Sequence, residues 1–387
     1  MNPSSGPLRI LHLNSLLTGG GTDDQCVKLA GELHKLGQRV WLAGPAGRLF
    51  APVIEQLGVP FFDTGAKAGK FQFIRRAADL IRRENIQILH GHHGRDLWPT
   101  IFAARLAGTK PKIVLTRHMA KSPGSWASRN FLLGQCDALI AVSEFVAKVL
   151  RDGAYEPESP EAERRVRPPI RGDHSKIHVI SGGIDTAKFF PADASSKRRE
   201  LGLEAGEYAF AVAGGFDLPR GKGQREFLAA AARIHKETPR ARFLIIGRGS
   251  LADVLNRDIE QLGLRDKARL TGQVSDMPQV VNAIDCLVHP QIGTEALGLV
   301  ICEAHACGKP VIASALDGIP EAFAPGGYGR LVAPENVEEL AQAMRIQASQ
   351  AKPDAGYAAQ LHARIAETFS ITIMAEKTKR LYAELFN

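Results

Sequence analysis

Short apolar segments alternate with longer amphipathic segments from Leu8 onward. The short segments have the length and composition of strands, and the longer ones repeat their apolar residues with the period of a helix. This alternation is typical of βαβ units that build a mostly parallel sheet. The helices predicted in the first half include residues 25–36, 71–83 and 97–107. The strands predicted there are residues 8–13, 39–42, 86–89, 112–115, 138–142 and 177–180.

The alternation is interrupted twice. Residues 152–175 are crowded with proline, glutamate and arginine and have no clear period, which predicts a long exposed loop. Residues 185–206 combine proline with mixed charges, and we place a linker there. A second series follows, with strands predicted at residues 208–213, 242–246, 269–270, 286–288, 311–313 and 330–332.

The pattern therefore predicts an α/β fold with two Rossmann-like domains. A chain of 387 residues also exceeds the roughly 100 to 200 residues of a single domain. We expect an N-terminal domain at residues 1–184 and a C-terminal domain at residues 185–369. Residues 370–387 have a helical period and are expected to pack back on the N-terminal domain.

Composition and charge narrow the class of protein. No segment approaches the ~20 consecutive apolar residues that span a bilayer. The short polar start before Leu8 lacks the basic and apolar parts of a secretion signal, so a cytoplasmic location is expected. Five cysteines without CxxC pairing indicate reduced structural thiols. The net charge of +8 favours a negatively charged partner, which can be nucleotide phosphate, anionic lipid or nucleic acid.

A run of three glycines lies between the first predicted strand and the first predicted helix. Gly20 and Gly21 would let the backbone approach a ligand closely, and the helix N-terminus behind them suits a phosphate. The run does not match the GxGxxG pattern of dinucleotide-binding loops. A tight turn without a ligand is the alternative interpretation.

The segment from Glu295 to Ala313 carries the strongest chemical signal. Glu295 precedes a predicted apolar helix, and Glu303 lies within it. Carboxylates at the carboxyl end of a parallel sheet can accept hydrogen bonds from sugar and ribose hydroxyls, and first-turn amides at Leu299 and Val300 suit a phosphate. Taken by themselves, the two glutamates are explained better as a carboxylate near the helix dipole and a solvated side chain.

The flanking sequence agrees in order with a known family. A His-Pro pair at residues 289–290 precedes the two glutamates, an Asp-Gly-Ile-Pro-Glu segment at 317–321 follows them, and a Lys-Gly pair stands at 222–223. Together with the spacing of the glutamates, these elements resemble the retaining glycosyltransferases of family 4, which share the two-domain architecture called GT-B. The resemblance covers nearly the whole chain and implies a nucleotide-sugar-dependent glycosyltransferase.

The resemblance assigns roles in the second half of the chain. Glu303 would hold the ribose hydroxyls, Glu295 would hold the donor sugar or its loop, and Lys222 would neutralise the leaving diphosphate. Glu295 and Lys222 then belong to the catalytic set. The family usually has an arginine beside the first glycine of the strand end, whereas this chain has a glycine pair at 214–215. Arg220 is the candidate for the missing charge. If it points to solvent, Lys222 and backbone amides neutralise the phosphates.

Histidines follow two predicted strands of the first half. The sequence has no DxD motif and no acidic ligand spacing near them, so neither a metal requirement nor a bound cofactor is expected. The resemblance implies that His118 is a catalytic contact to the donor sugar. It places His92, His93 and Arg95 on the acceptor side. For His93, and with less weight for His118, a hydrogen-bonded histidine at a loop end is the alternative interpretation.

The resemblance implies an enzyme of the hexosyltransferase type that retains the anomeric configuration. Retaining members are thought to use front-face attack within an ion pair, in which the leaving phosphate takes the acceptor proton. We expect a UDP-sugar donor and a lipopolysaccharide core, another surface glycan or a lipid-linked precursor as acceptor. A small soluble acceptor is the alternative. A basic nucleic-acid-binding α/β protein is the alternative from another class, but the dispersed charges and missing motifs argue against a nucleic-acid partner.

The predicted helix at residues 71–83 has two interpretations. Phe71 and Phe73 accompany a cluster of arginines, a combination suited to the anionic inner face of the plasma membrane. A peripheral position there would bring the enzyme to a lipid-linked acceptor. An ordinary surface helix that buries Phe73 and solvates its arginines fits equally well.

Overall fold

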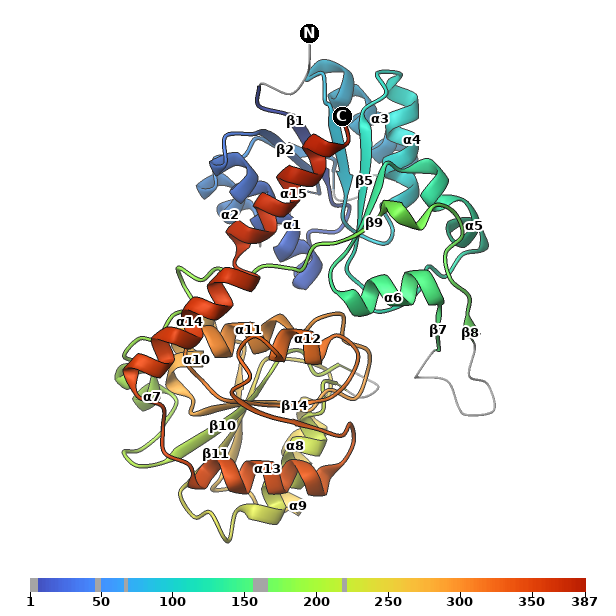
Figure 1. The fold of residues 1–387 in the computed structure, drawn as a ribbon. Coiled ribbons are helices and arrows are strands. Elements are labelled where there is room, and N and C mark those ends of the chain that lie inside the picture. The colour runs from blue at the N-terminus through green and yellow to red at the C-terminus, as the bar shows by residue number, and fades with distance from the viewer. Residues whose placement is uncertain (1–5, 46–49, 66–68, 156–165, 218–220) are drawn as a thin grey trace. The chain divides into compact units, whose positions relative to one another are not determined.

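The computed structural model describes residues 6–45, 50–65, 69–155, 166–217 and 221–387. The chain divides into two compact units: unit 1 contains Met1–Gly183 and Ile371–Asn387, and unit 2 contains Ile184–Ser370. Each unit holds one parallel sheet with helices on both faces (Figure 1). The predicted α/β fold with two Rossmann-like domains is therefore confirmed.

Unit 1 is built on a seven-stranded parallel sheet with the order β3-β2-β1-β4-β5-β6-β9. Its strands are β1 Arg9–Leu13, β2 Arg39–Gly44, β3 Phe61–Asp63, β4 Ile88–Gly91, β5 Lys112–Arg117, β6 Ala138–Ala141 and β9 Ile177–Val179. Its helices are α1 Gly21–Lys35, α2 Ala51–Gln56, α3 Lys70–Arg83, α4 Leu97–Ala107, α5 Trp126–Gln135, α6 Glu144–Asp152 and α15 Ile371–Glu384.

The strands of unit 1 are apolar on both sides because helices cover both faces of the sheet. Ile10 of β1 packs in a buried cluster with residues of α1 and α15, whereas the next residue, Leu11, packs with α3 and α4 on the opposite face. Helix α15 lies against α1, and its Tyr382 is fully buried. The last helix of the chain therefore completes the core of unit 1.

Unit 2 has a six-stranded parallel sheet with the Rossmann order β12-β11-β10-β13-β14-β15. Its strands are β10 Tyr208–Ala213, β11 Ala241–Ile246, β12 Ala268–Gly272, β13 Cys286–His289, β14 Val311–Ser314 and β15 Gly329–Val332. Its helices are α7 Ser195–Glu200, α8 Gln224–Ile234, α9 Ala252–Gln261, α10 Met277–Ala283, α11 Leu299–Ala306, α12 Ile319–Phe323, α13 Val337–Ser349 and α14 Ala355–Phe369.

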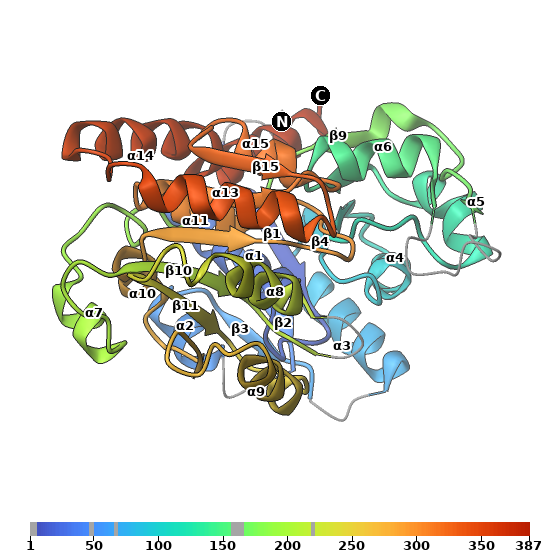
Figure 2. The same ribbon diagram turned by 90° about the horizontal axis from the view of Figure 1, so that it is seen from below.

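Two buried clusters hold the helices of unit 2 on its sheet. Side chains of α8, α9 and α13 pack with one face, and side chains of α10, α11, α12 and α14 pack with the other. Figure 2 shows α13 and α8 side by side over the same face. None of the helices in the described ranges combines the length and the apolar character that crossing a bilayer takes.

The two interruptions of the sequence pattern differ from expectation. Within residues 152–175, predicted to be a loop, β7 Ala154–Tyr155 pairs antiparallel with β8 Val166–Arg167, and a 3-10 turn forms at His174–Lys176. Strands of two residues are too short to produce a period, and residues 156–165 lie outside the described ranges. The expected linker at 185–206 packs into unit 2, where Phe189 and Leu201 are buried in the core.

Candidate functional site

The strand order of each sheet reverses once. In unit 1, β1 pairs with both β2 and β4, and in unit 2, β10 pairs with both β11 and β13. Open α/β sheets bind their ligands at the carboxyl ends of the strands at this point. Most of the predicted site residues follow these strands.

Close backbone packing fixes the turn that carries Lys222. Gly223 caps α8 with φ of 83°, and a Cβ at this position would lie 1.9 Å from the carbonyl oxygen of Pro290. Gly214, after β10, has φ of 138°, and a Cβ there would lie 2.9 Å from Cδ of Lys222. The two glycines therefore hold the lysine side chain at the carboxyl edge, beside the loop that follows β13.

Lys222 and Glu295 form the charged centre of this edge. Nζ of Lys222 donates a hydrogen bond to Oε2 of Glu295 across 3.2 Å. Burial raises the pKa of the Glu295 carboxyl, but the charge and hydrogen bond of Lys222, together with His289 and the Leu297 amide, outweigh burial, so the pKa is lowered. The ionised carboxylate can accept hydrogen bonds from hydroxyls, and the ammonium can move to a phosphate.

His289 ends β13 beside this pair. Its Nε2 lies 3.9 Å from Oε2 of Glu295, but burial, followed by the charge of Lys222, lowers the pKa of the imidazole to about 4. The ring is neutral at pH 7, so the contact is not an ion pair. Neither of its nitrogens has a hydrogen-bond partner among the described residues. Buried polar atoms of this kind commonly bind a ligand or water.

The loop that holds Glu295 is tied to the next loop by its own backbone. The Glu295 amide donates to Oδ2 of Asp317 across 3.1 Å, and the Gly318 amide donates to the Glu295 carbonyl across 3.2 Å. Gly298 then turns the chain into α11 with φ of 87°. These contacts place Glu295 just before the helix N-terminus, as the motif predicts.

Helix α11 supplies the remaining predicted residues of unit 2. Leu299 and Val300 form its first turn, and Glu303 follows one turn later; all three side chains are partly buried. The free amides of such a turn attract anions. Arg220, the candidate second cation, lies outside the described residues.

The carboxyl edge of unit 1 gathers buried histidines. His12 of β1 stands opposite His90 of β4 in the sheet register. Nδ1 of His12 and Nε2 of His92 share a hydrogen bond of 2.8 Å, and His90 contacts Thr116 Oγ1 at 2.6 Å and Tyr382 Oη at 2.5 Å. Burial lowers the pKa of each of the three imidazoles, to about 3 for His12.

The ring nitrogens of His12, His90 and His92 lie within 4.8 Å of one another, a spacing that a metal ion can bridge. Both nitrogens of His90 already contact protein groups, and His12 and His92 contact each other. The arrangement fits a neutral hydrogen-bonded cluster.

The predicted unit 1 residues divide between this cluster and the surface. His118 follows β5, and its ring stacks on His92 with centroids 5.8 Å apart; burial lowers its pKa to about 3. Nε2 of His118 and Nδ1 of His92 lack partners among the described residues. His93 accepts a hydrogen bond from the Arg95 amide at 3.2 Å, and the Arg95 side chain is exposed. The structure thus brings His92 and His118 together.

The glycine run forms a loop held by one carboxylate. Oδ2 of Asp23 accepts hydrogen bonds from the amides of Thr18 and Gly19, each at 3.0 Å. Gly20, with φ of 136°, caps α1, and Gly21 opens the helix. A Cβ on either Gly20 or Gly21 would meet no atom within 4 Å, so packing in unit 1 does not require these glycines. Open space at a helix N-terminus suits a ligand.

Sequence reasoning missed His12 and Tyr382 as members of the cluster. A histidine inside an otherwise apolar strand, at position 12, was an available signal for a buried polar site. Tyr382 had no such signal, because its contact with His90 joins residues 292 positions apart.

Two family models match this chain, one in each half. The family model "Glycosyltransferase Family 4" matches residues 19–160, and the model "Glycosyl transferases group 1" matches residues 207–348. A D-inositol 3-phosphate glycosyltransferase of Mycobacterium marinum is 30% identical over 78% of this chain and 65% of its own length. The chain spans about one third to two thirds of such curated relatives, since another is covered over 36% of its length.

Solved structures share the fold over the full length. A glycosyltransferase from Rickettsia africae has a TM-score of 0.81 at 21% identity, covering 98% of this chain and 99% of that one. Anabaena HepE in complex with UDP and glucose has a TM-score of 0.77 at 20% identity, covering 97% and 99%. With both halves matched by family models and the GT-B fold present, this chain belongs to glycosyltransferase family 4.

Proposed function

We propose that this protein is a retaining, hexosyltransferase-type enzyme that moves a sugar from a UDP-sugar to a hydroxyl acceptor. The observation that carries the proposal is the Lys222–Glu295 pair beside the N-terminus of α11, at the strand-order reversal of unit 2. A cation, a carboxylate and free helix amides at one edge match the phosphates and hydroxyls of a nucleotide sugar.

The proposed donor roles are those that the family resemblance implies, and the positions of the groups at the carboxyl edge of unit 2 are compatible with them. The amides of Leu299 and Val300 and the ammonium of Lys222 bind the diphosphate. Glu303, one turn into α11, accepts hydrogen bonds from the ribose, and Glu295 accepts them from the sugar. In unit 1, the glycine loop with Gly20 and Gly21 at the N-terminus of α1 is proposed as a further phosphate-binding element.

The chemistry is the departure of a charged leaving group. Breaking the glycosidic bond leaves negative charge on the diphosphate, and groups placed to stabilise that charge lower the barrier. Lys222 supplies this charge. His118 and His92 remain neutral because burial lowers their pKa, so they donate or accept hydrogen bonds to sugar hydroxyls without adding charge. No base from the protein is required if the leaving phosphate takes the acceptor proton.

The acceptor is proposed to carry phosphate. The relative from Mycobacterium marinum is named for D-inositol 3-phosphate, which favours a phosphorylated polyol over the lipopolysaccharide core or other surface glycan expected from the sequence. His92, His93 and Arg95 lie at the carboxyl edge of unit 1 and form the acceptor side in this proposal.

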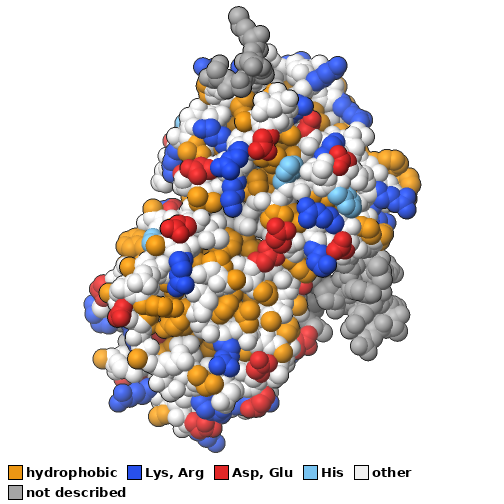
Figure 3. Space-filling view, viewed as in Figure 1, with side chains coloured by type: hydrophobic (Ala, Val, Ile, Leu, Met, Phe, Trp, Pro, Cys, Tyr) orange, Lys and Arg blue, Asp and Glu red, His pale blue; other side chains and the backbone are white. Residues whose placement is uncertain are grey.

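A peripheral position on an anionic membrane extends the proposal. Phe71 is 76% exposed and Trp126 is 66% exposed, and basic residues of α3 and α5 accompany them. Figure 3 shows hydrophobic and basic side chains next to one another on the α5 side of unit 1. Phe73, in contrast, is buried in the core. Such a mixed surface suits anionic lipid headgroups.

Vesicle flotation tests the membrane contact. The chain should float with vesicles that contain anionic lipid and not with neutral ones, and Phe71→Ser with Trp126→Ser should abolish flotation. Phe190→Ser, at an exposed phenylalanine of unit 2, is the matched control and should float normally. Equal flotation with neutral vesicles, or none with anionic ones, rejects the membrane contact.

Thermal stabilisation by nucleotides tests the donor site. UDP and UDP-sugars should raise the melting temperature more than GDP or ADP do. A ligand at 100 times its Kd adds about 2.7 kcal/mol to the free energy of unfolding. Lys222→Ala and Glu303→Ala should lose the stabilisation, whereas Lys236→Ala, at an exposed lysine after α8, should keep it. Stabilisation that survives in both site variants would remove the donor assignment, and an inverted product would remove the retaining mechanism.

A further inference from the structure

A groove in unit 1 lies outside the histidine cluster. It is formed by the first turn of α3, the loop after β4 together with α4, the end of β5, and the loop that leads into α5. Its lining residues are Lys70, Ile74, Gly94, Arg95, Leu97, Trp98, Pro99, Phe102, Arg117, Pro123, Gly124, Ser125 and Ser128. We call it the basic groove.

The charge of the basic groove has one sign. Lys70, Arg95 and Arg117 line it, and the lining includes no carboxylate. Within the described part of the chain, neither Lys70 nor Arg95 forms an ion pair with an acidic side chain. The first turns of α3, α4 and α5 all contribute lining residues, so three helix N-termini add positive potential. A groove of this kind selects an anion.

Arg117 is held in place before any ligand binds. Its side chain is buried, and both Nε and Nη2 donate hydrogen bonds to the carbonyl oxygen of Lys121. Nη1 lies 3.4 Å from the position that a Cβ on Gly94 would take, so the absence of a side chain at residue 94 leaves the guanidinium its room. Because its rotamer is fixed, binding an anion here costs little side-chain entropy.

An aromatic wall stands beside these cations. The rings of Trp98 and Phe102 lie 5.9 Å apart, and Phe102 is 45% exposed. The indole nitrogen of Trp98 donates to Ser128 Oγ at 2.9 Å, and Ser125 Oγ donates to Ser128 Oγ at 2.8 Å. These bonds fix the indole plane, which gives a flat apolar surface next to the positive charge.

We propose that the basic groove is an acceptor subsite that binds the phosphate of a phosphorylated cyclic polyol or sugar, with the ring lying against Trp98 and Phe102. Its description as an acceptor subsite rests on the proposed glycosyl transfer, whereas the binding of the phosphate does not. Arg117 directly precedes His118, and Arg95 follows His92 by three residues. A phosphate in the groove would therefore hold a neighbouring hydroxyl near the histidine cluster.

Calorimetric titration of the full chain tests this subsite. The probes are myo-inositol 1-phosphate and glucose 6-phosphate, each paired with its unphosphorylated form. Vesicles with phosphatidylinositol present the same headgroup on a lipid and are compared with neutral vesicles. The phosphorylated probes should bind about tenfold or more tightly than the neutral ones, because charge-assisted hydrogen bonds are the strong ones.

The substitutions are made at Lys70 and Arg95, which are both exposed, so we expect the variants to fold normally. Lys70→Gln with Arg95→Gln should weaken binding of the phosphorylated probe about tenfold or more. Arg75→Gln, on α3 but outside the groove lining, is the matched control and should leave binding unchanged. Binding by the soluble probes identifies a free phosphorylated acceptor, and binding by the vesicles alone identifies a lipid headgroup; both support the subsite.

The opposite results separate this proposal from the proposed function. Equal binding of phosphorylated and neutral probes, or full binding by the double variant, overturns the subsite. UDP is titrated in the same experiment. Binding of UDP without binding of any phosphorylated probe overturns the subsite and leaves the transferase proposal standing. Binding of phosphorylated probes without UDP leaves the anion site and removes the transferase role.

Discussion

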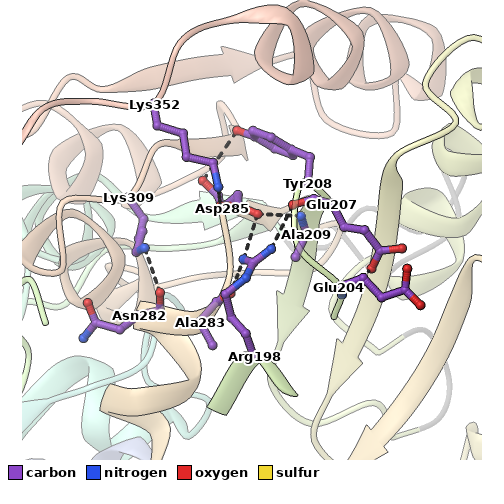
Figure 4. A network of polar contacts seen from close by, with 10 residues as sticks. All are labelled: Arg198, Glu204, Glu207, Tyr208, Ala209, Asn282, Ala283, Asp285, Lys309 and Lys352. Atoms are coloured by element: carbon purple, nitrogen blue, oxygen red, sulfur yellow. Dashed lines mark hydrogen bonds and ion pairs between the residues drawn. The ribbon is translucent and has the colours of Figure 1, made fainter. Parts of the chain in front are cut away.

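The two ends of β13 carry polar groups in opposite situations. At the amino end, Asp285 is 8% exposed and receives hydrogen bonds or ion pairs from Arg198 at 2.9 Å, Lys352 at 2.6 Å and the Ala209 amide at 2.8 Å (Figure 4). At the carboxyl end, His289 is 1% exposed, and both of its nitrogens lack partners among the described residues. Only three residues of β13 separate the hydrogen-bonded carboxylate of Asp285 from the imidazole of His289, which has no such partner.

This difference in hydrogen bonding indicates that the two ends of β13 have different roles. The partners of Asp285 come from α7, the start of β10 and the segment after α13, so one carboxylate ties three parts of unit 2 together. Such a network stabilises the fold. The imidazole of His289 has no hydrogen-bond partner among the described residues, and a buried group of this kind can bind a ligand or water. The amino end therefore supports the sheet, and the carboxyl end belongs to the proposed donor site.

The largest effect should follow from removing Asp285. Asp285→Ala removes the carboxylate that Arg198, Lys352 and the Ala209 amide contact, and Arg198 keeps only two backbone carbonyls as acceptors. Loss of one partner in a buried ionic network costs about 3 kcal/mol. We expect faster hydrogen exchange of the β10 and β13 amides, measured by mass spectrometry, and a lower melting temperature.

His289→Leu provides the contrast at the other end of the strand. Replacing an unpartnered buried imidazole by an apolar side chain of similar volume should leave exchange protection nearly unchanged, while nucleotide binding weakens. If the two variants lose protection equally, the two ends of β13 do not have different tasks.

A smaller but sharper effect concerns the pH dependence of catalysis. Lys222→Gln removes the charge that lowers the pKa of Glu295, while burial, which raises it, remains. The acidic limb of kcat/KM should therefore move to higher pH, and kcat/KM at neutral pH should fall about 100- to 1000-fold with the loss of the cation.

The Lys222–Glu295 pair also makes the stability of the fold depend on pH. In the natural protein the pKa of Glu295 is lowered, so its contribution is fully present above the pKa of the unfolded chain and is lost as pH falls through the folded value. Rate measurements from pH 4 to 9 on both forms check the catalytic shift. An unmoved acidic limb would show that Glu295 does not need to be ionised.

The sequence predicted most of what depends on local pattern. Most strands of both sheets follow from short apolar segments. The motif names Lys222 and Glu295 as separate donor-site residues, and the contact between them is a finding of the structure. Three short strands were not predicted: β3 has three residues, and β7 and β8 have two each, which is too few for a recognisable period. The equally short β9 was predicted from the apolar residues at 177–180.

The contacts that depend on strand order could not be predicted from the sequence. His12 meets His90 because β1 pairs with β4, and Asp285 meets Arg198 and Lys352 because three distant segments converge at the amino end of one sheet. The backbone of Gly223 likewise lies against Pro290. This contact explains why the Lys-Gly pair at 222–223 and the His-Pro pair at 289–290 occur in the same chain. A pattern along the sequence shows the type of each residue, but it does not predict which distant residues come into contact.

The smallest expected effect tests whether burial or the linking of two elements causes the loss of stability in Asp285→Ala. Arg345 of α13 pairs with Glu237, after α8, at 2.7 Å, and the glutamate is 59% exposed. This pair also ties two elements of unit 2 together, but solvent screens it, and exposed pairs contribute about 0.2 to 1 kcal/mol. Glu237→Gln should lower the melting temperature by about 2 °C or less. High salt should shrink the difference further because surface charges are screened. A loss as large as that of Asp285→Ala would mean that linking elements, and not burial, sets the cost.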